Sequence, residues 1–213
     1  MFKDQYTDIF QAISPIIGDL YQWGKSYITK LTKPGMYEVI SYDSTLEILD
    51  IKGKEAVFTK TEEIRFLQDN IIAFQDQAWG DGKILLDYQC SPGVPVDFYR
   101  NGHKTHVLIS FREVKNKDDQ LTMNIQWKIK DGFLTNDGYW GTAIIHSTRK
   151  LKVRIIFPRN RVPHQIQLIN PNHKIETDFK KENLLQLPDK HWQVTWEKKN
   201  PKINQNYLIK WEW

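Results

Sequence analysis

The sequence predicts a mainly β fold, an antiparallel β-sandwich of two sheets, from three observations. Apolar and polar side chains alternate with period two through about the last ninety residues, and tryptophans lie on the apolar phase. Turn residues (Gly, Pro, Asn, Asp) interrupt the chain at intervals typical of β-sandwich loops. One such segment carries Leu121, Met123, Ile125, Trp127 and Ile129. A period of two places alternate side chains on the same face of a strand, so each segment is a half-buried strand.

Residues 1–33 are expected to form a helical segment that precedes the β region. Their apolar side chains recur at spacings of three and four: Phe2, Tyr6, Ile9, Phe10, Ile13, Ile17 and Leu20. Ser14 and Pro15 suit the N-cap and first residue of a second helix, or else a kink in one long helix, and Pro34-Gly35 ends the segment. We expect this amphipathic helix to pack on the sandwich or to mediate a homo-oligomer.

Residues 34–213 are expected to form the β-sandwich. Strands are predicted near 37–42, 45–51, 55–60, 63–67, 70–75, 84–88, 105–113, 121–130, 139–146, 150–157, 164–169, 191–197 and 206–213. This number of short strands is larger than one flat sheet usually contains, which favours two packed sheets. A seam near 91–103 separates shorter, charged strands from longer, Trp-rich ones. One composite domain and two abutting β units are both open at this point. In outline the pattern resembles immunoglobulin-like sandwiches, without the paired cysteines of antibody domains.

Composition favours a folded, cytoplasmic protein. The 213 residues include 8 Trp, 9 Tyr and 10 Phe, enough bulk for a core. The lone Cys90 excludes an internal disulfide, and the first residues lack the features of a signal peptide. Charged and amide residues interrupt every apolar run, so we expect no membrane span.

Motifs of the common enzyme classes are absent. The sequence has no nucleophile elbow, Walker loop, dinucleotide-binding glycine pattern or His-Glu-x-x-His helix. His103 and His106 lie three apart in a predicted strand, which points them to opposite faces and disfavours a metal site. We therefore predict no metal and no cofactor, and an enzyme is the less favoured class.

Two segments are candidates for binding. The first contains Gln75, Asp76, Trp79 and Asp81, which combine carboxylates and an amide with an aromatic surface for a cation, sugar or base. The alternative for this segment is a β-turn that fixes Trp79 at the core edge. The second is the irregular connection from Cys90 to His106, which contains Asp97, Arg100 and His103.

A basic band at 149–161 is the third candidate surface. It carries Arg149, Lys150, Lys152, Arg154, Arg159 and Arg161 with no acidic residue between them. Lys150, Lys152 and Arg154 share one phase of a strand, so their charges project from one face, where they suit nucleic-acid phosphates. The structural alternative is a solvated face or a lysine-protected edge strand.

We expect a non-enzymatic module that recognises a protein partner or a small ligand through its loops. The first alternative is a nucleic-acid-binding protein that uses the basic strand 149–161. The second is a hydrolase or transferase with a site built from loops 75–81 and 97–106.

Overall fold

The computed structural model describes residues 35–170, 175–179 and 183–213, which contain strands and no α-helix. The strands are β1 (Tyr37–Ile48), β2 (Glu55–Phe66), β3 (Ile71–Ala78), β4 (Lys83–Ser91), β5 (Val94–Asn101), β6 (Lys104–Lys115), β7 (Gln120–Lys130), β8 (Asp137–Ile144), β9 (Thr148–Phe157), β10 (Gln165–Asn170), β11 (Ile175–Asp178), β12 (Leu184–Gln186), β13 (Trp192–Lys199) and β14 (Gln205–Glu212). The prediction of a mainly β chain is therefore confirmed. The helix expected in 1–33 lies outside the described residues.

The strands form three sheets rather than the two that the sequence predicts. A seven-stranded sheet has the order β12-β13-β9-β1-β2-β7-β4. A four-stranded sheet has the order β11-β10-β14-β8, and a three-stranded sheet has the order β3-β6-β5. The pairing is antiparallel except between β1 and β9, which run parallel. The seven-stranded sheet draws strands from both sides of the expected seam at 91–103.

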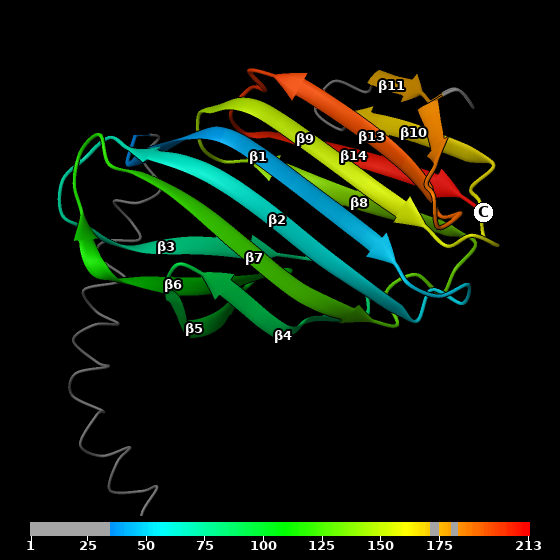
Figure 1. Ribbon diagram of the computed structural model, residues 1–213, viewed down its shortest axis with the longest axis horizontal. Coiled ribbons are helices and arrows are strands. Elements are labelled where there is room, and N and C mark those ends of the chain that lie inside the picture. The colour runs from blue at the N-terminus through cyan, green and yellow to red at the C-terminus, as the bar shows by residue number, and fades with distance from the viewer. Residues whose placement is uncertain (1–34, 171–174, 180–182) are drawn as a thin grey trace, which may run out of the picture.

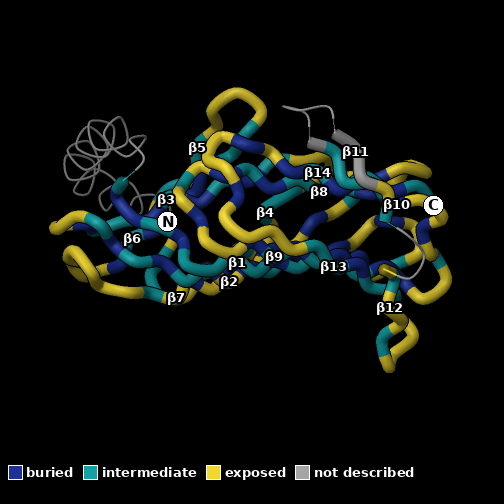
Figure 2. Tube along the Cα trace, turned by 90° about the horizontal axis from the view of Figure 1, so that it is seen from above, coloured by how far each residue is buried: buried dark blue, intermediate teal, exposed yellow. Residues whose placement is uncertain are grey.

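Both smaller sheets pack against the same face of the seven-stranded sheet, as Figures 1 and 2 show. Phe66 of β2 contacts Phe111 of β6, with ring centroids 5.6 Å apart. At the other end, Phe157 of β9 contacts Trp211 of β14 at 5.4 Å. The core is thus one continuous layer of apolar side chains, covered by two sheets placed side by side.

The period-two pattern places the tryptophans as expected. Trp127 and Trp211 are buried in this core, and Trp196 is partly buried against Tyr207, with ring centroids 4.9 Å apart. Burying an aromatic side chain removes a large apolar area from water, which is the main favourable term in such a core.

The first two strands are longer than predicted, and the reasons differ. In β1 the register shifts between Val39 and Ser41, so a β-bulge moves the inward phase from odd to even residue numbers. The predicted strands 37–42 and 45–51 are therefore parts of one strand. In β2 the inward phase never changes, but Lys60 and Glu62 occupy it. The polar run from 60 to 63 lies where the predicted strands 55–60 and 63–67 were separated, but both belong to β2.

Three strands escaped the sequence analysis: β5, β11 and β12. β5 contains Pro95, which lowers strand propensity but is tolerated because β5 is the outer strand of its sheet. The expected irregular connection 91–103 is thus largely a strand. The loops expected at 75–81 and 97–106 likewise begin or end within β3, β5 and β6, which all belong to the three-stranded sheet.

Candidate functional site

Two adjoining cavities lie where the two smaller sheets meet over the seven-stranded sheet. The inner cavity has a volume of about 70 Å³ and the outer cavity about 270 Å³. Trp79, Trp140 and Gly141 line both cavities and so mark their junction. We call the two cavities together the groove. Trp79 follows β3, whereas Trp140 and Gly141 lie on β8, so the groove joins the three-stranded and four-stranded sheets.

The inner cavity has a charged floor. Lys60 Nζ lies 2.6 Å from Asp76 Oδ1 and 3.2 Å from Glu62 Oε1. Tyr88 donates its hydroxyl proton to Asp76 Oδ2 at 2.9 Å. Lys60, Glu62 and Asp76 are 8%, 6% and 3% exposed, respectively. Because Lys60 and Glu62 come from β2 and Asp76 from β3, the cluster links two sheets across the core.

Burial and the neighbouring carboxylates shift the pKa of Lys60 in opposite directions. Burial lowers the pKa of Lys60, but the Asp76 and Glu62 carboxylates outweigh this effect and raise it above its ordinary value. Burial raises the pKa of Glu62, and the neighbouring Lys60 opposes that rise only in part. Burial also raises the pKa of Tyr42, to about 12, so its hydroxyl group stays protonated and uncharged near pH 7. The charges of Lys60 and Asp76 balance each other, and Glu62 is a second carboxyl group beside the same lysine. We call Glu62 the surplus carboxyl group.

Aromatic rings surround this charged floor. Lys60 Nζ lies 5.6 Å from the ring centroid of Tyr42 and 5.8 Å from that of Phe74. Trp127 and Trp140 also line the inner cavity, with ring centroids 6.0 Å apart. Indole and phenyl faces carry negative electrostatic potential, so they attract cations as well as apolar groups.

His146 also lines the inner cavity. Its ring contacts that of Tyr37 in a tilted arrangement with centroids 4.1 Å apart, and its buried Nδ1 atom has no hydrogen-bond partner among the described residues. Burial, assisted by the positive charge of Lys60, lowers the pKa of His146 to about 4. The imidazole is therefore neutral near pH 7 and adds no positive charge to the cavity.

The outer cavity is lined by aromatic residues, glycines and carboxylates. Tyr139 donates to Asp81 Oδ2 at 3.3 Å, and Asp137 lies on the same lining. These three residues are exposed, so the outer cavity opens to solvent. An added Cβ at Gly141 would lie 3.2 Å from Leu208 Cδ1 and 3.5 Å from Trp79 Cζ2, so the Gly141 backbone lies close to Trp79 at the junction.

The structure brings together four of the residues that the sequence singled out. Asp76 lies in the charged floor, Trp79 lies at the junction, Asp81 lies on the outer rim, and Gln75 lines the inner cavity. Gln75 Nε2 also lies 2.6 Å from His106 Nδ1.

The second candidate segment lies apart from the groove. Asp97, Arg100 and His103 do not line either cavity. Arg100 and His103 are exposed, at the end of β5 and in the turn that leads to β6. The groove therefore does not bring Asp76 or Asp81 to either of these basic side chains.

Several groove residues were missed from sequence. Lys60 and Glu62 could have been found, because they are charged residues on the inward phase of a strand. Tyr88, Trp140 and His146 gave no such signal, because only long-range strand pairing brings them to Asp76 and Trp79.

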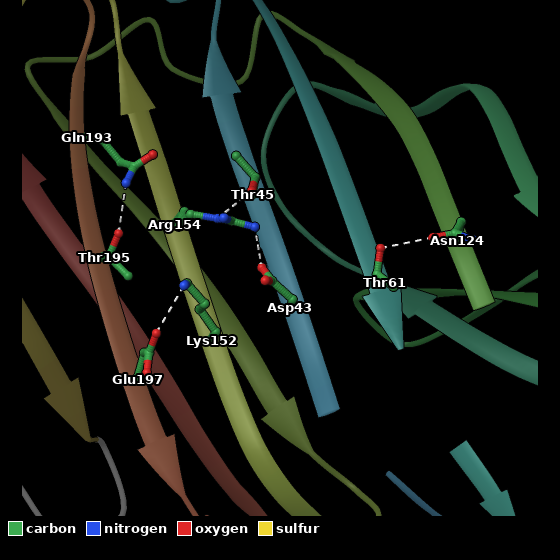
Figure 3. Close-up of polar contacts among 9 residues, drawn as sticks. All are labelled: Asp43, Thr45, Thr61, Asn124, Lys152, Arg154, Gln193, Thr195 and Glu197. Carbon is green, nitrogen blue, oxygen red and sulfur yellow. Dashed lines mark hydrogen bonds and ion pairs between the residues drawn. The ribbon is translucent and has the colours of Figure 1, made fainter. Parts of the chain in front are cut away.

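The basic band lies on the outer face of the seven-stranded sheet, where acidic neighbours pair with it. Arg154 contacts Asp43 at 2.5 Å and Thr45 at 3.1 Å, and Lys152 contacts Glu197 at 3.0 Å, as Figure 3 shows. These partners come from β1 and β13, which flank β9. These partners could not be predicted from the sequence, because they lie far from the band along the chain.

The remaining cations of the band have different surroundings. Arg149 pairs with Glu38 at 2.7 Å. Arg161 lies over the ring of Trp213, 4.1 Å from its centroid, and donates to the carbonyl oxygen atoms of Phe133 and Thr135. Lys150 and Arg159 have no ion pair among the described residues and lie at the solvent-exposed surface. Half of the six cations in the band are thus engaged in ion pairs with acidic residues of other strands.

Neither a metal-binding cluster nor a membrane-crossing helix occurs within the described ranges. No group of three or more His, Cys, Asp or Glu side chains there is arranged to hold a metal ion. The same ranges contain no helix of the length and apolar character needed to cross a membrane.

Comparison with known proteins gives no family. No protein-family model and no curated protein matches the sequence. Among solved structures, an M1 zinc metallopeptidase from Deinococcus radiodurans has 9% sequence identity and a TM-score of 0.47, over 83% of this chain and 42% of that one. A mutant of a two-domain M1 zinc metallopeptidase bound to L-tryptophan has 8% identity and a TM-score of 0.49, over 82% and 42%. This chain thus covers less than half of those proteins, and likenesses this distant support no statement about its function.

Proposed function

We propose that this protein is a non-enzymatic binding module that holds a small ligand in the groove between its two smaller sheets. The observation that carries the proposal is the Lys60–Glu62–Asp76 cluster, buried at the floor of a cavity with tryptophan walls. Removing three charged groups from water costs several kcal/mol per ion, and apolar residues of similar size often give equal or greater stability. Stability alone therefore does not account for the cluster, whereas recognition of a polar ligand group does.

The shape of the groove also fits a small ligand. Ligand sites are concave and mostly apolar with a few convergent polar groups, and about 300 Å³ is the lower end of their usual volume. The two cavities approach that volume together, at about 70 and 270 Å³. The binding residues come mainly from strands, so the expectation of recognition through loops is replaced by recognition through a groove. A cytoplasmic location, which the lone Cys90 favours, remains part of the proposal.

A fragment screen with a blocking variant tests this function. Saturation-transfer NMR on the full chain would use four probes of different chemistry: 2-phenylethylammonium, phenylacetate, methyl β-glucoside and adenosine. We expect at least one probe to bind, and Gly141→Leu to weaken it because the added side chain fills the junction beside Trp79. Val96→Leu, a control at an exposed position that lines neither cavity, should leave binding unchanged. Binding that is insensitive to Gly141→Leu, or no binding of any probe, would contradict the proposal.

A further inference from the structure

The charge balance of the groove identifies a class of ligand. Within the inner cavity Lys60 and Asp76 form the shortest ion pair, and Tyr88 takes the second oxygen of Asp76. Glu62 uses only Oε1, which contacts Lys60 at 3.2 Å. Its Oε2 atom has no hydrogen-bond partner in the part of the chain that the structure describes, although Glu62 is 6% exposed and lines the cavity. The carboxylate of Glu62 thus lines the cavity with one oxygen that Lys60 does not contact.

We propose that the groove binds a small organic cation, with its ammonium head beside Glu62 Oε2 and its body in the outer cavity. This inference rests on the proposed function and adds the chemistry of the ligand. An ammonium N–H donated to Oε2 supplies the missing hydrogen bond and neutralises the surplus carboxylate. The inner cavity of about 70 Å³ exceeds the roughly 10–15 Å³ needed for a group the size of water.

The walls of the groove favour a cation over other ligand classes. The inner cavity is walled by rings of Tyr42, Phe74, Trp127 and Trp140, which attract an ammonium group through their faces. Among the described residues that line the outer cavity there is no Lys or Arg, whereas Asp81 and Asp137 contribute two carboxylates. An anionic ligand would meet this surplus negative charge, and Lys60, the cation of the inner cavity, is already engaged by two carboxylates.

Neutral ligands and bare metal ions fit less well. A sugar would leave the Glu62 carboxylate without a counter-ion in a site of low dielectric constant, which is costly. A hard cation such as Ca²⁺ requires six to eight oxygen ligands, and aromatic carbons replace most of them here. An organic ammonium needs only one acceptor and apolar or aromatic surroundings.

The test compares a cation with its neutral isostere on the intact chain. Isothermal titration calorimetry would measure 2-phenylethylammonium and 2-phenylethanol, which differ in the ammonium group and otherwise match in shape. We expect the ammonium compound to bind about tenfold more tightly, a factor typical of a partly desolvated cation against rings and a carboxylate. Equal or tighter binding of the alcohol would overturn the inference, and failure of the ammonium compound to bind would also overturn it.

Variants assign the preference to Glu62. Glu62→Gln keeps the size of the side chain and removes its charge, so it should reduce the tenfold preference to about twofold or less. Asp97→Asn removes a carboxylate outside the groove and should leave the preference unchanged. If Glu62→Gln does not fold, Asp137→Asn on the outer lining provides the second test, with a smaller loss of preference. A preference that survives both groove variants contradicts the assignment.

The outcomes separate the two proposals. If phenylacetate, the glucoside or adenosine binds in a way that Gly141→Leu blocks, while the ammonium compound does not bind, the groove is a ligand site for another class. If no probe binds, the proposed function fails together with the inference.

Discussion

Lys60 and Asp76 form an ion pair across the core, with Nζ 2.6 Å from Oδ1, that joins the seven-stranded sheet to the three-stranded sheet. Asp76 follows Lys60 by sixteen positions, and the turn from β2 to β3 lies between them. A short connection and a buried ion pair therefore hold the same two strands together. The pair defines the floor of the groove. Its position therefore couples the stability of the sandwich to the geometry of the candidate site.

The first prediction concerns the cost of breaking this cluster. Lys60→Met leaves Asp76 and Glu62 buried without their counter-ion, and we expect a loss of about 3–5 kcal/mol in the free energy of unfolding. The triple variant Lys60→Met/Glu62→Gln/Asp76→Asn removes every charge, keeps an acceptor for Tyr88, and should recover most of that loss. Urea unfolding at pH 7 measures both. A triple variant less stable than Lys60→Met would show that the charges themselves stabilise the fold.

The second prediction concerns acid. His146 has a pKa of about 4 in the fold and 6.5 in the unfolded chain, so the unfolded chain binds more protons between these values. The stability contribution of neutral His146 is therefore complete above pH 6.5 and is lost as the pH falls towards 4, by about 3 kcal/mol. Glu62 acts oppositely: its raised pKa gives stability that is complete below 4.5 and is lost as the pH rises through the folded value.

A difference measurement isolates the histidine. Unfolding free energies of the wild type and His146→Gln would be measured from pH 7.5 to 4, because subtraction cancels the Glu62 effect. The wild type should lose more stability than the variant as the pH falls. Parallel curves would show that His146 titrates normally.

The third prediction concerns the tryptophans of the core. Trp127→Ala should lower the free energy of unfolding by about 3–5 kcal/mol, because it leaves a large cavity among Phe58 and Trp140. Trp196→Ala should cost less, since Trp196 is only partly buried. Chemical unfolding of both variants checks the order, and a larger cost at Trp196 would contradict the packing described here.

The fourth prediction concerns the basic band. Because Lys152 and Arg154 are paired with Glu197 and Asp43, we expect weak nucleic-acid binding that falls steeply with salt and shows no sequence preference. Glu197→Gln/Asp43→Asn frees the two cations and should increase any such affinity, whereas Lys152→Glu/Arg154→Glu should abolish it. Fluorescence anisotropy with labelled single-stranded and double-stranded DNA at low salt measures this. Tight binding of wild type that survives Lys152→Glu/Arg154→Glu would contradict this description of the band.

The fold was more predictable than the site, for a physical reason. Strand alternation is local, so most strands and the burial of Trp127 and Trp211 follow from spacing alone. The β1 bulge and the inward Lys60 and Glu62 broke that alternation, and both broke it beside the groove. Such departures from the local rule mark functional sites in many proteins.

Predicting the groove from sequence requires knowledge of long-range strand pairing, which residue spacing does not contain. Asp76, Trp79 and Asp81 were found because they cluster along the chain. Their partners on β8 lie about sixty residues away and arrive through the pairing of β8 with β14 and packing on β2. Asp97 and His103 belong to the candidate segment that follows Asp76 along the chain, but they do not line the groove.

The most direct test of the ligand groove is a titration that reports on each tryptophan. The chain has 8 tryptophans, of which Trp79, Trp127 and Trp140 line the groove, and fluorine-labelled tryptophan gives a separate NMR signal for each. On addition of 2-phenylethylammonium we expect the signals of these three to shift together, with Trp192 and Trp196 unchanged, because neither of them lines the groove. Shifts confined to Trp192 and Trp196, or no shift at any tryptophan, would contradict the groove as the binding site.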